Sequence, residues 1–287
     1  MKVLYISLGQ PDYQCDCLLH GFYNLLGDDF THSDDYHLMY KQFTNSEILR
    51  GLSGRGFTIW GNLPEYHNDN TDLESKIRNR YFDYIVYGSF RRCSDYIDLV
   101  TSVYPKSRIA IVDGEDDTRI HNPFDLLLFK RELEHPLVNT LPISFSVPKE
   151  KIVKQTSNII KTKMSSDYKP NYPGTGYIYD SEVDYYNNYQ EAFFGLTHKK
   201  GGWDCMRHYE ILANYCLPHF PDLKHCPTMT MVNFPKDDIL KSNNLIENGF
   251  DNDLYYDILN RVFEYTKENL TTEISSKYVL DNLIKLN

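Results

Sequence analysis

The sequence contains no long apolar run. No stretch approaches the ~20 consecutive apolar residues that a membrane-spanning helix needs, and the apolar run at residues 3–8 is too short for the core of a signal peptide. The six cysteines form no Cys-x-x-Cys pair and match no common zinc-site spacing. We therefore expect a cytoplasmic protein with free thiols and no metal.

The chain is also poor in positive charge and in several catalytic motifs. It has 30 Lys and Arg against 40 Asp and Glu, a net charge of -10, which disfavours a general nucleic-acid binder but permits a local phosphate site. The Walker loop, the Gly-x-Ser-x-Gly elbow, the His-Glu-x-x-His motif and the Gly-x-Gly-x-x-Gly turn are missing. P-loop ATP hydrolysis, serine hydrolase chemistry and hydride transfer are therefore disfavoured, and no cofactor is expected.

Short apolar runs that alternate with helical stretches are present instead. This alternation indicates βαβ units and a parallel, doubly wound α/β sheet. The predicted strands lie at residues 3–8, 57–60, 84–88, 108–112 and 126–129, and the predicted helices at residues 18–26, 73–81 and 96–103. Ligands bind beyond the carboxyl ends of the strands in such sheets. The loops at 9–20, 88–92 and 113–117 should therefore share one face.

The character of the sequence changes near residue 147. Pro142 and Pro148 bracket a short apolar segment, and polar, lysine-rich sequence follows to about residue 173. We place an interdomain connection here, with one Rossmann-like domain at residues 1–147 and a second, smaller domain at residues 148–287. The second is predicted to contain helices at 185–194 and 205–215, short strands at 195–197 and 217–220, and closing amphipathic helices at 254–270 and 278–286.

The second half contains one motif suited to an anion. Lys199, Lys200, Gly201 and Gly202 form a basic, glycine-containing loop, and glycines let backbone N–H groups approach an anion closely. We expect a helix to begin at Cys205 with Asp204 as its N-cap. A helix N-terminus with Arg207 in its first turn suits a diphosphate. Glu210 lies on the same helix face, where its carboxylate can accept two ribose hydroxyls.

A purely structural role fits the same residues about equally well on spacing alone. The glycine pair then forms only a turn and Asp204 only a cap. Arg207 and Glu210 would form a surface pair worth a few tenths of a kcal/mol, and Trp203 would belong to the core.

A family resemblance favours the functional interpretation. Residues 201–214, GGWDCMRHYEILAN, followed by Leu217 and Pro218, resemble the C-terminal donor site of glycosyltransferases with the GT-B fold. The resemblance implies a metal-independent enzyme that transfers a hexosyl or pentosyl group from a nucleotide-sugar to a hydroxyl acceptor. It covers mainly residues 185–220. The pair Tyr215-Cys216 departs from the usual small residue before the final strand, and the second half is short for a full Rossmann domain.

The resemblance also implies roles for individual residues. Lys199, Lys200 and Arg207 would hold the donor diphosphate, and Glu210 the ribose. Lys130 and Arg131 could reach the donor phosphates from the other domain, and Arg91 and Arg92 are further basic candidates. The remaining candidates for donor binding are Thr197, Gly201, Gly202, Trp203, Asp204 and His208.

Carboxylates follow the predicted strand at 108–112. Asp113, Glu115 and Asp117 could bind a divalent cation through oxygen ligands, and they loosely resemble the Asp-x-Asp motif of metal-dependent, GT-A-like glycosyltransferases. Asp113 or Glu115 could alternatively act as a general base on the acceptor hydroxyl. A solvated acidic turn explains the same pattern.

Two further candidates for the base are Asp16 and His20, which we expect in or just after the loop that follows the first strand. In GT-B enzymes this loop faces the acceptor. The acceptor itself stays open between a glycan, a protein, a small molecule and a modified nucleic-acid base. A non-catalytic module that binds nucleotide-sugars is the alternative from another functional class.

Overall fold

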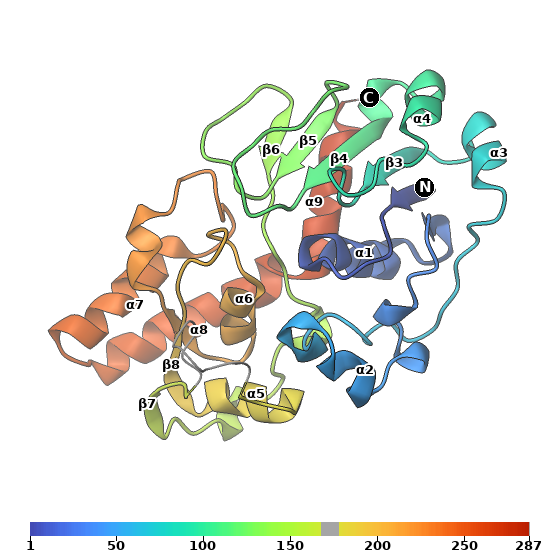
Figure 1. The fold of residues 1–287 in the computed structure, drawn as a ribbon. Helices are drawn as coiled ribbons and strands as arrows, with labels where there is room; N and C mark the ends of the chain where they lie inside the picture. Colours follow the sequence, from blue (N-terminus) through green and yellow to red (C-terminus); the bar gives the residue numbers. More distant parts are fainter. Residues whose placement is uncertain (168–177, 287) are drawn as a thin grey trace.

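The computed structural model describes residues 1–167 and 178–286 (Figure 1). The first half contains a six-stranded, all-parallel sheet with strand order β2-β1-β3-β4-β5-β6. The strands are β1 (Val3–Ile6), β2 (Phe30–His32), β3 (Tyr84–Tyr87), β4 (Ile109–Asp113), β5 (Leu127–Lys130) and β6 (Thr140–Pro142). The central strands β1, β3, β4 and β5 are buried along their whole length, as expected for strands covered on both faces.

Helices cover both faces of this sheet. Leu4 and Ile6 of β1 pack with α3 (Leu73–Arg78) and α4 (Ile97–Val103), whereas Val3 and Tyr5 pack with α1 (Tyr13–Leu26) and α9 (Thr272–Ile284). Successive side chains of a strand point to opposite faces, so the alternation in β1 assigns one helix pair to each face. The short α2 (Ser46–Arg50) lies between β2 and α3 in the chain.

The C-terminal helix returns to the first half and lies along α1 (Figure 1). A Cβ at Gly21 would overlap the carbonyl of Thr272, so glycine permits the close approach of the two helices. His20 Nδ1 lies 2.8 Å from Thr272 Oγ1, and Ser276 Oγ donates to Leu18 O at 2.9 Å. The closing helices predicted from the sequence are thus present, and α9 completes the core of the first sheet.

The second half contains a smaller parallel sheet with strand order β7-β8-β9. Its strands are β7 (Lys163–Ser165), β8 (Ala192–Leu196) and β9 (Leu217–His219), and its helices are α5 (Glu182–Gln190), α6 (Met206–Ala213), α7 (Lys236–Asn248) and α8 (Asn252–Asn269). The two sheets fall on either side of residue 147, while α9 packs against the first. The domain boundary at 147/148 stays a prediction, and part of the connection expected up to about residue 173 lies outside the described residues.

The predicted strand at residues 57–60 is wrong. The chain there leaves a 3-10 turn, η4 (Ser53–Gly56), and does not pair with either sheet. Positive φ angles at Gly54, Arg55, Thr58 and Gly61 turn the backbone repeatedly, which an apolar pattern alone does not reveal. The three-residue strands β2, β6 and β7 and helix α7 were not predicted. The helix predicted at 185–194 ends earlier, at Gln190, and the strand predicted at 195–197 is β8, which begins at Ala192.

Candidate active site

The carboxyl edge of the first sheet carries a network of ion pairs. Lys130 Nζ at the end of β5 lies 3.0 Å from Asp113 Oδ2 at the end of β4, and both side chains are buried. Arg91, in the loop after β3, binds Asp117 through two hydrogen bonds of 2.8 and 3.0 Å. Its guanidinium also lies 3.5 Å from Asp113. The loops predicted to share one face therefore do so.

The other two carboxylates of the acidic loop are paired as well. Arg92 holds Glu115 through hydrogen bonds of 2.6 and 3.2 Å, and Arg131 pairs with Asp116. The hydrogen bond from Arg92 keeps the pKa of Glu115 below its ordinary value, and those from Arg91 and Arg119 lower the pKa of Asp117. Glu115 and Asp117 are therefore ionised, and cations of the chain itself neutralise them.

The acidic loop does not gather its oxygens around a common point for a metal. In the described part of the chain, no group of three or more His, Cys, Asp or Glu side chains could hold a metal ion. Asp113, Glu115 and Asp117 instead face ammonium and guanidinium groups. The geometry gives no support to the GT-A-like alternative.

Asp16 and His20 do not lie in a loop, because α1 begins earlier than predicted. The carboxylate of Asp12 accepts the N–H groups of Gln14 and Cys15 and caps the helix at its first turn. Asp16 is buried, and its Oδ2 accepts from Trp60 Nε1 at 2.7 Å. Burial raises the pKa of Asp16 well above its ordinary value.

His20 lies one turn further along α1 and faces away from the sheet edge. Its ring contacts Thr272 of α9 and Glu150, at 2.8 and 2.9 Å. The two predicted bases in this region thus hold helices and loops together, and neither lines the cavities described below.

The basic loop predicted to bind the donor docks on the carboxyl end of β5. The carboxylate of Glu132 accepts the backbone N–H groups of Trp203 and Asp204, both at 3.0 Å. A Cβ at Gly202 would overlap Glu132, and one at Gly201 would overlap Asp116. The glycines therefore permit close packing of the loop on the first half of the chain. The N–H groups of Trp203 and Asp204 are thus taken by a side chain of the protein, and the predicted binding of a donor diphosphate by this loop stays a prediction.

Asp204 is not the N-cap of α6. The helix begins at Met206 after Cys205, which makes no side-chain capping bond. The Asp204 carboxylate instead accepts from Phe145 N at 2.7 Å and from Tyr209 Oη at 2.9 Å. Its carbonyl accepts from Arg131 at 2.7 Å. These hydrogen bonds connect α6 with the segment after β6. Burial raises the pKa of Asp204 to about 6.

Arg207 lies in the first turn of α6, as predicted, and its side chain is buried. Lys200 is exposed at the loop tip. Its ammonium is nevertheless partly desolvated, and this desolvation and the charge of Arg207 lower the pKa of Lys200. Lys199 sits over the Trp203 ring, with Nζ 5.5 Å from the ring centroid.

His208 is held by Thr197, another predicted donor residue. Its Nδ1 lies 3.0 Å from Thr197 Oγ1, and its Nε2 lies 3.0 Å from Trp203 O. Complete burial lowers the pKa of His208 to about 3. The neutral ring can donate to the Trp203 carbonyl and accept from the Thr197 hydroxyl, so it orders the loop and adds no charge.

Glu210 is buried, and both of its carboxylate oxygens are occupied by hydroxyl groups. Oε1 accepts from Thr58 Oγ1 at 2.5 Å, and Oε2 accepts from Tyr185 Oη at 2.7 Å. Burial raises its pKa. Thr58 has φ +76° and also donates its N–H to Glu182 at 2.7 Å. Neither Thr58 nor Glu182 could be recognised from the sequence, because the apolar residues around Thr58 resemble a strand.

Two cavities lie on either side of Trp60. One, of about 250 Å³, lies between the ends of the first sheet and the Arg131–Phe145 region, and Glu115 and Arg92 line it. The Tyr13 and Trp60 rings form one wall, with centroids 4.7 Å apart. The second cavity, of about 310 Å³, lies against the N-terminus of α5 and is lined by Arg55 and Glu182 among others. The first cavity is lined by residues of the first half alone, whereas the second opens between segments of the two halves of the chain.

No family model matches the sequence, and no curated protein does. In structure, the chain is similar to an α-glucosyltransferase solved in complex with UDP and a 13-mer DNA containing a central A:G mismatch. That similarity has a TM-score of 0.51 at 9% sequence identity, over 98% of this chain and 99% of the other. An α-glucosyltransferase with UDP and a 13-mer DNA containing an HMU base gives a TM-score of 0.49 at 8% identity, over 99% of each chain.

The chain has a GT-B glycosyltransferase fold. The predicted α/β, GT-B-like fold class is thereby confirmed, while its division into two Rossmann-like domains stays a prediction. Because the similarity extends over nearly the whole chain, it includes both sheets and the segments between which the two cavities open. Within the described residues, no helix combines the length and apolar character required to cross a bilayer.

Proposed function

We propose that this protein is a glycosyltransferase that moves a sugar from a nucleotide-sugar donor to a hydroxyl acceptor. The observation that carries the proposal is the docking of the basic segment 199–210 onto the carboxyl ends of β4 and β5. This arrangement occurs in a chain with the fold of a glucosyltransferase solved with UDP. It brings predicted donor residues and a candidate acceptor cavity to one edge of the sheet, where ligands of parallel α/β sheets bind.

The donor diphosphate would be held by side chains more than by backbone groups. The Glu132 carboxylate already takes the N–H groups of Trp203 and Asp204. Lys200 and Arg207, whose charges lie close enough to lower the pKa of Lys200, would then stabilise the negative charge that develops on the leaving diphosphate. Lys199 lies in the same loop. This mechanism needs no metal ion.

The ribose would bind at Glu210 by exchange of hydroxyl groups. Glu210 Oε1 now accepts a hydrogen bond from Thr58, and a ribose hydroxyl can donate the same bond. The carboxylate would lose no hydrogen bond in the exchange, so the displacement of Thr58 costs little at the carboxylate itself. Thr58 is also held at a positive φ that β-branched residues rarely adopt.

The acceptor would enter the cavity of about 250 Å³ beside Tyr13 and Trp60. Of the four predicted catalytic residues, only Glu115 lines this cavity, and we assign it as the general base on the acceptor hydroxyl. Its lowered pKa keeps it deprotonated, as a base must be, but also weakens it as a base, so the proton transfer requires the bond from Arg92 to loosen. The similar glucosyltransferases were solved with DNA, so a hydroxyl on a modified base is the first acceptor to test.

A screen of nucleotide-sugars tests the donor site directly. The melting temperature of the protein is measured with UDP-, GDP-, ADP-, CMP- and TDP-sugars, and we expect UDP-glucose to stabilise it. Lys200→Ala should reduce the transfer rate by about 10²-fold or more through loss of leaving-group stabilisation, while Lys224→Ala, an exposed lysine in η8 (Pro221–His225), should have no effect. Stabilisation by none of the nucleotide-sugars would remove the basis of the proposal.

The same protein sample tests the two alternatives, a metal-dependent transferase and a non-catalytic module that binds nucleotide-sugars. Transfer that persists in EDTA excludes the metal-dependent mechanism. Stabilisation by a nucleotide-sugar without transfer or hydrolysis, across glycan, protein, small-molecule and modified-DNA acceptors, would identify a binding module instead of an enzyme.

A further inference from the structure

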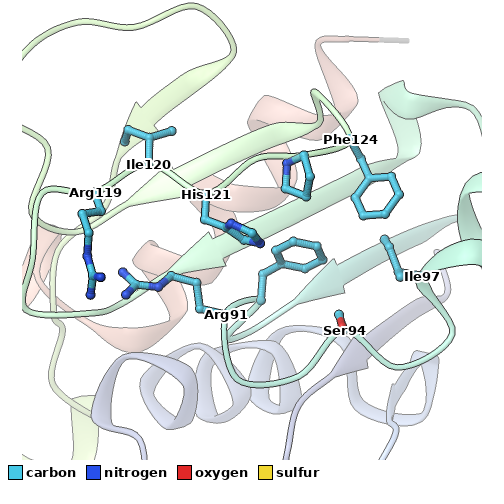
Figure 2. A pocket seen from close by; sticks show the side chains of 9 residues that line it. Arg91, Ser94, Ile97, Arg119, Ile120, His121 and Phe124 are labelled. Atoms are coloured by element: carbon cyan, nitrogen blue, oxygen red, sulfur yellow. The ribbon is translucent and has the colours of Figure 1, made fainter.

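A third pocket, of about 520 Å³, is lined by residues of the loop after β3 and of the loop between β4 and β5 (Figure 2). The loop after β3 contributes Phe90 and Arg91, and the loop between β4 and β5 contributes Arg119, His121 and Phe124. The consecutive arginines serve different cavities, because Arg92 lines the acceptor cavity and Arg91 lines this pocket. Of the donor candidates named from the sequence, Arg91 lines it and no residue of the segment 197–210 does. Its volume is in the range of small-ligand sites.

One end of the pocket is cationic. Figure 2 shows the guanidinium groups of Arg91 and Arg119 together at this end. Asp117 binds both, with hydrogen bonds of 2.8 and 3.0 Å to Arg91 and of 2.6 and 3.1 Å to Arg119. The neighbouring Asp113 pairs with the buried Lys130. Three cations thus face two carboxylates, and the excess positive charge is held in a fixed position beside the pocket.

The cation best placed for a ligand is Arg119. Its side chain is 76% exposed, although Asp117 fixes its orientation. A guanidinium that is pre-oriented and open to solvent on one side suits the fork-like geometry of a phosphate group. An inorganic anion alone would satisfy this end of the pocket and leave the rest of it unused.

The rest of the pocket is aromatic. The His121 ring lies over Phe90 in a stacked arrangement, with centroids 6.0 Å apart and an interplanar angle of 30°. Phe124 stands edge-on to Phe90 at 6.3 Å. Phe90 is buried whereas His121 is exposed, so the supported His121 ring offers its outer face to the solvent. Such a face accepts a nucleobase by stacking, and it does so with little preference for one base over another.

We propose that this pocket is a second nucleotide site, which takes one nucleoside phosphate unit with its phosphate on Arg119 and Arg91 and its base against His121. The site is separate from the donor site at Lys199–Glu210 and does not depend on the proposed transferase activity. The unit can be a free nucleotide or one residue of a single strand, since both present the same base and phosphate.

Binding of UMP and AMP to the full-length protein tests the site. Titrations are followed by calorimetry and by NMR of the histidine ring protons, with the His121 signal assigned from His121→Gln. We expect the His121 signal to shift on binding and Arg119→Ala to weaken binding by about tenfold or more, as for loss of a hydrogen bond to a charged group. Arg78→Ala is the matched control, since Arg78 is an exposed arginine paired with Glu74 on α3, and it should leave binding unchanged.

Three results would overturn the proposal. They are a His121 signal that stays fixed at millimolar UMP and AMP, equal affinities of Arg119→Ala and wild type, and a response to inorganic phosphate as strong as the response to UMP. Lys200→Ala, which should weaken UDP-sugar binding, should leave the His121 response intact. Failure of the donor site and failure of this pocket are therefore distinguishable.

Binding of a short single-stranded oligonucleotide shows whether the nucleoside phosphate is a free nucleotide or one residue of a strand. Affinity at least about tenfold above that of UMP, lost again in Arg119→Ala, indicates a residue within a strand, because additional phosphates and bases then contribute. Equal affinities of strand and mononucleotide indicate a free nucleotide.

Discussion

The carboxylates at the end of β4 and those around α6 lie beside each other but have different partners. Asp113 and Asp117 pair with lysine and arginine side chains. Asp204 and Glu210 accept hydrogen bonds from neutral groups, a backbone N–H and three hydroxyls. The pKa of Asp117 is accordingly lowered, whereas the pKa values of Asp204 and Glu210 are raised.

This difference in partners implies a difference in function. A carboxylate paired with a guanidinium is ionised, and its removal leaves a cation without its counter-ion. A carboxylate bound to hydroxyls can exchange them for the hydroxyls of a ligand with little change in its own hydrogen bonding. The first set therefore shapes the sheet edge, while Glu210 is suited to a sugar.

The largest effect is expected at the buried pair of Lys130 and Asp113. Lys130 is fully buried with its Nζ 3.0 Å from Asp113. Lys130→Met removes the nearer cation of the buried Asp113 carboxylate and leaves it with Arg91 at 3.5 Å, and we expect it to lower the free energy of unfolding by up to about 3–5 kcal/mol. Urea denaturation measures the change.

Two controls show whether the charge is responsible. Lys106→Met, at an exposed lysine before β4, should alter stability by less than about 0.5 kcal/mol. Combining Lys130→Met with Asp113→Asn removes both charges and should recover much of the loss. A double variant no more stable than Lys130→Met would show that packing, not charge, sets the effect.

The next largest effect is on the pH dependence of stability. It concerns Asp204, one of the two carboxylates around α6 that accept hydrogen bonds from hydroxyls. Folding raises the pKa of Asp204 from 3.8 to about 6, so between these values the folded state binds more protons than the unfolded state. Stability from this group is present below pH 3.8 and is lost as the pH rises to about 6. A shift of this size corresponds to up to about 3 kcal/mol. Asp204→Asn cannot ionise and should flatten the dependence of unfolding free energy on pH in this window.

The carboxylates that pair with cations should show the opposite dependence of stability on pH. The pKa of Glu115 is lowered by Arg92, so the stability it contributes is lost as the pH falls below the ordinary carboxyl range. An Asp204→Asn protein that keeps the full slope between pH 4 and 6 would contradict the assignment of that slope to Asp204.

The sequence predicted the regular parts of both halves for a simple reason. The buried strands β1, β3, β4 and β5 are continuous apolar runs, and such runs are long enough to be recognised. Strands β2 and β6 have three residues each, too few for any periodicity. The turns around Thr58 depend on positive φ angles that follow from tertiary contacts with Glu182 and Glu210.

Whether the segment 199–210 binds the donor stays a prediction, and the structure tests only its placement and contacts. The segment 199–210 does lie at the carboxyl edge of the first sheet, and Arg207 does lie in the first turn of α6. The contacts of Asp204 and Glu210 were not foreseeable, because their partners Phe145 and Thr58 are distant in sequence. Asp16 was misplaced because the cap at Asp12 starts α1 earlier than its apolar pattern suggests.

A smaller effect is expected from the backbone at Thr58. Thr58→Ala and Thr58→Gly both remove the hydroxyl that binds Glu210, but only glycine relieves the strain of φ +76°. We expect the glycine variant to be more stable than the alanine variant by about 0.5–1 kcal/mol, measured by urea denaturation. At Thr101, which lies within α4, the order should reverse, because glycine destabilises a helix interior by about 1 kcal/mol relative to alanine. The same order at both positions would rule out backbone strain at Thr58.

The smallest effect on stability, with a distinct effect on catalysis, is expected from Arg92→Ala. The pair of Arg92 and Glu115 is partly exposed, so its loss should change the free energy of unfolding by less than about 1 kcal/mol. The pKa of Glu115 should rise towards its ordinary value, because its main stabilising partner is gone. If Glu115 is the general base, the acid limb of the pH dependence of sugar transfer moves to higher pH in the variant. An acid limb that stays in place would assign the base to another group, even if stability changes as expected.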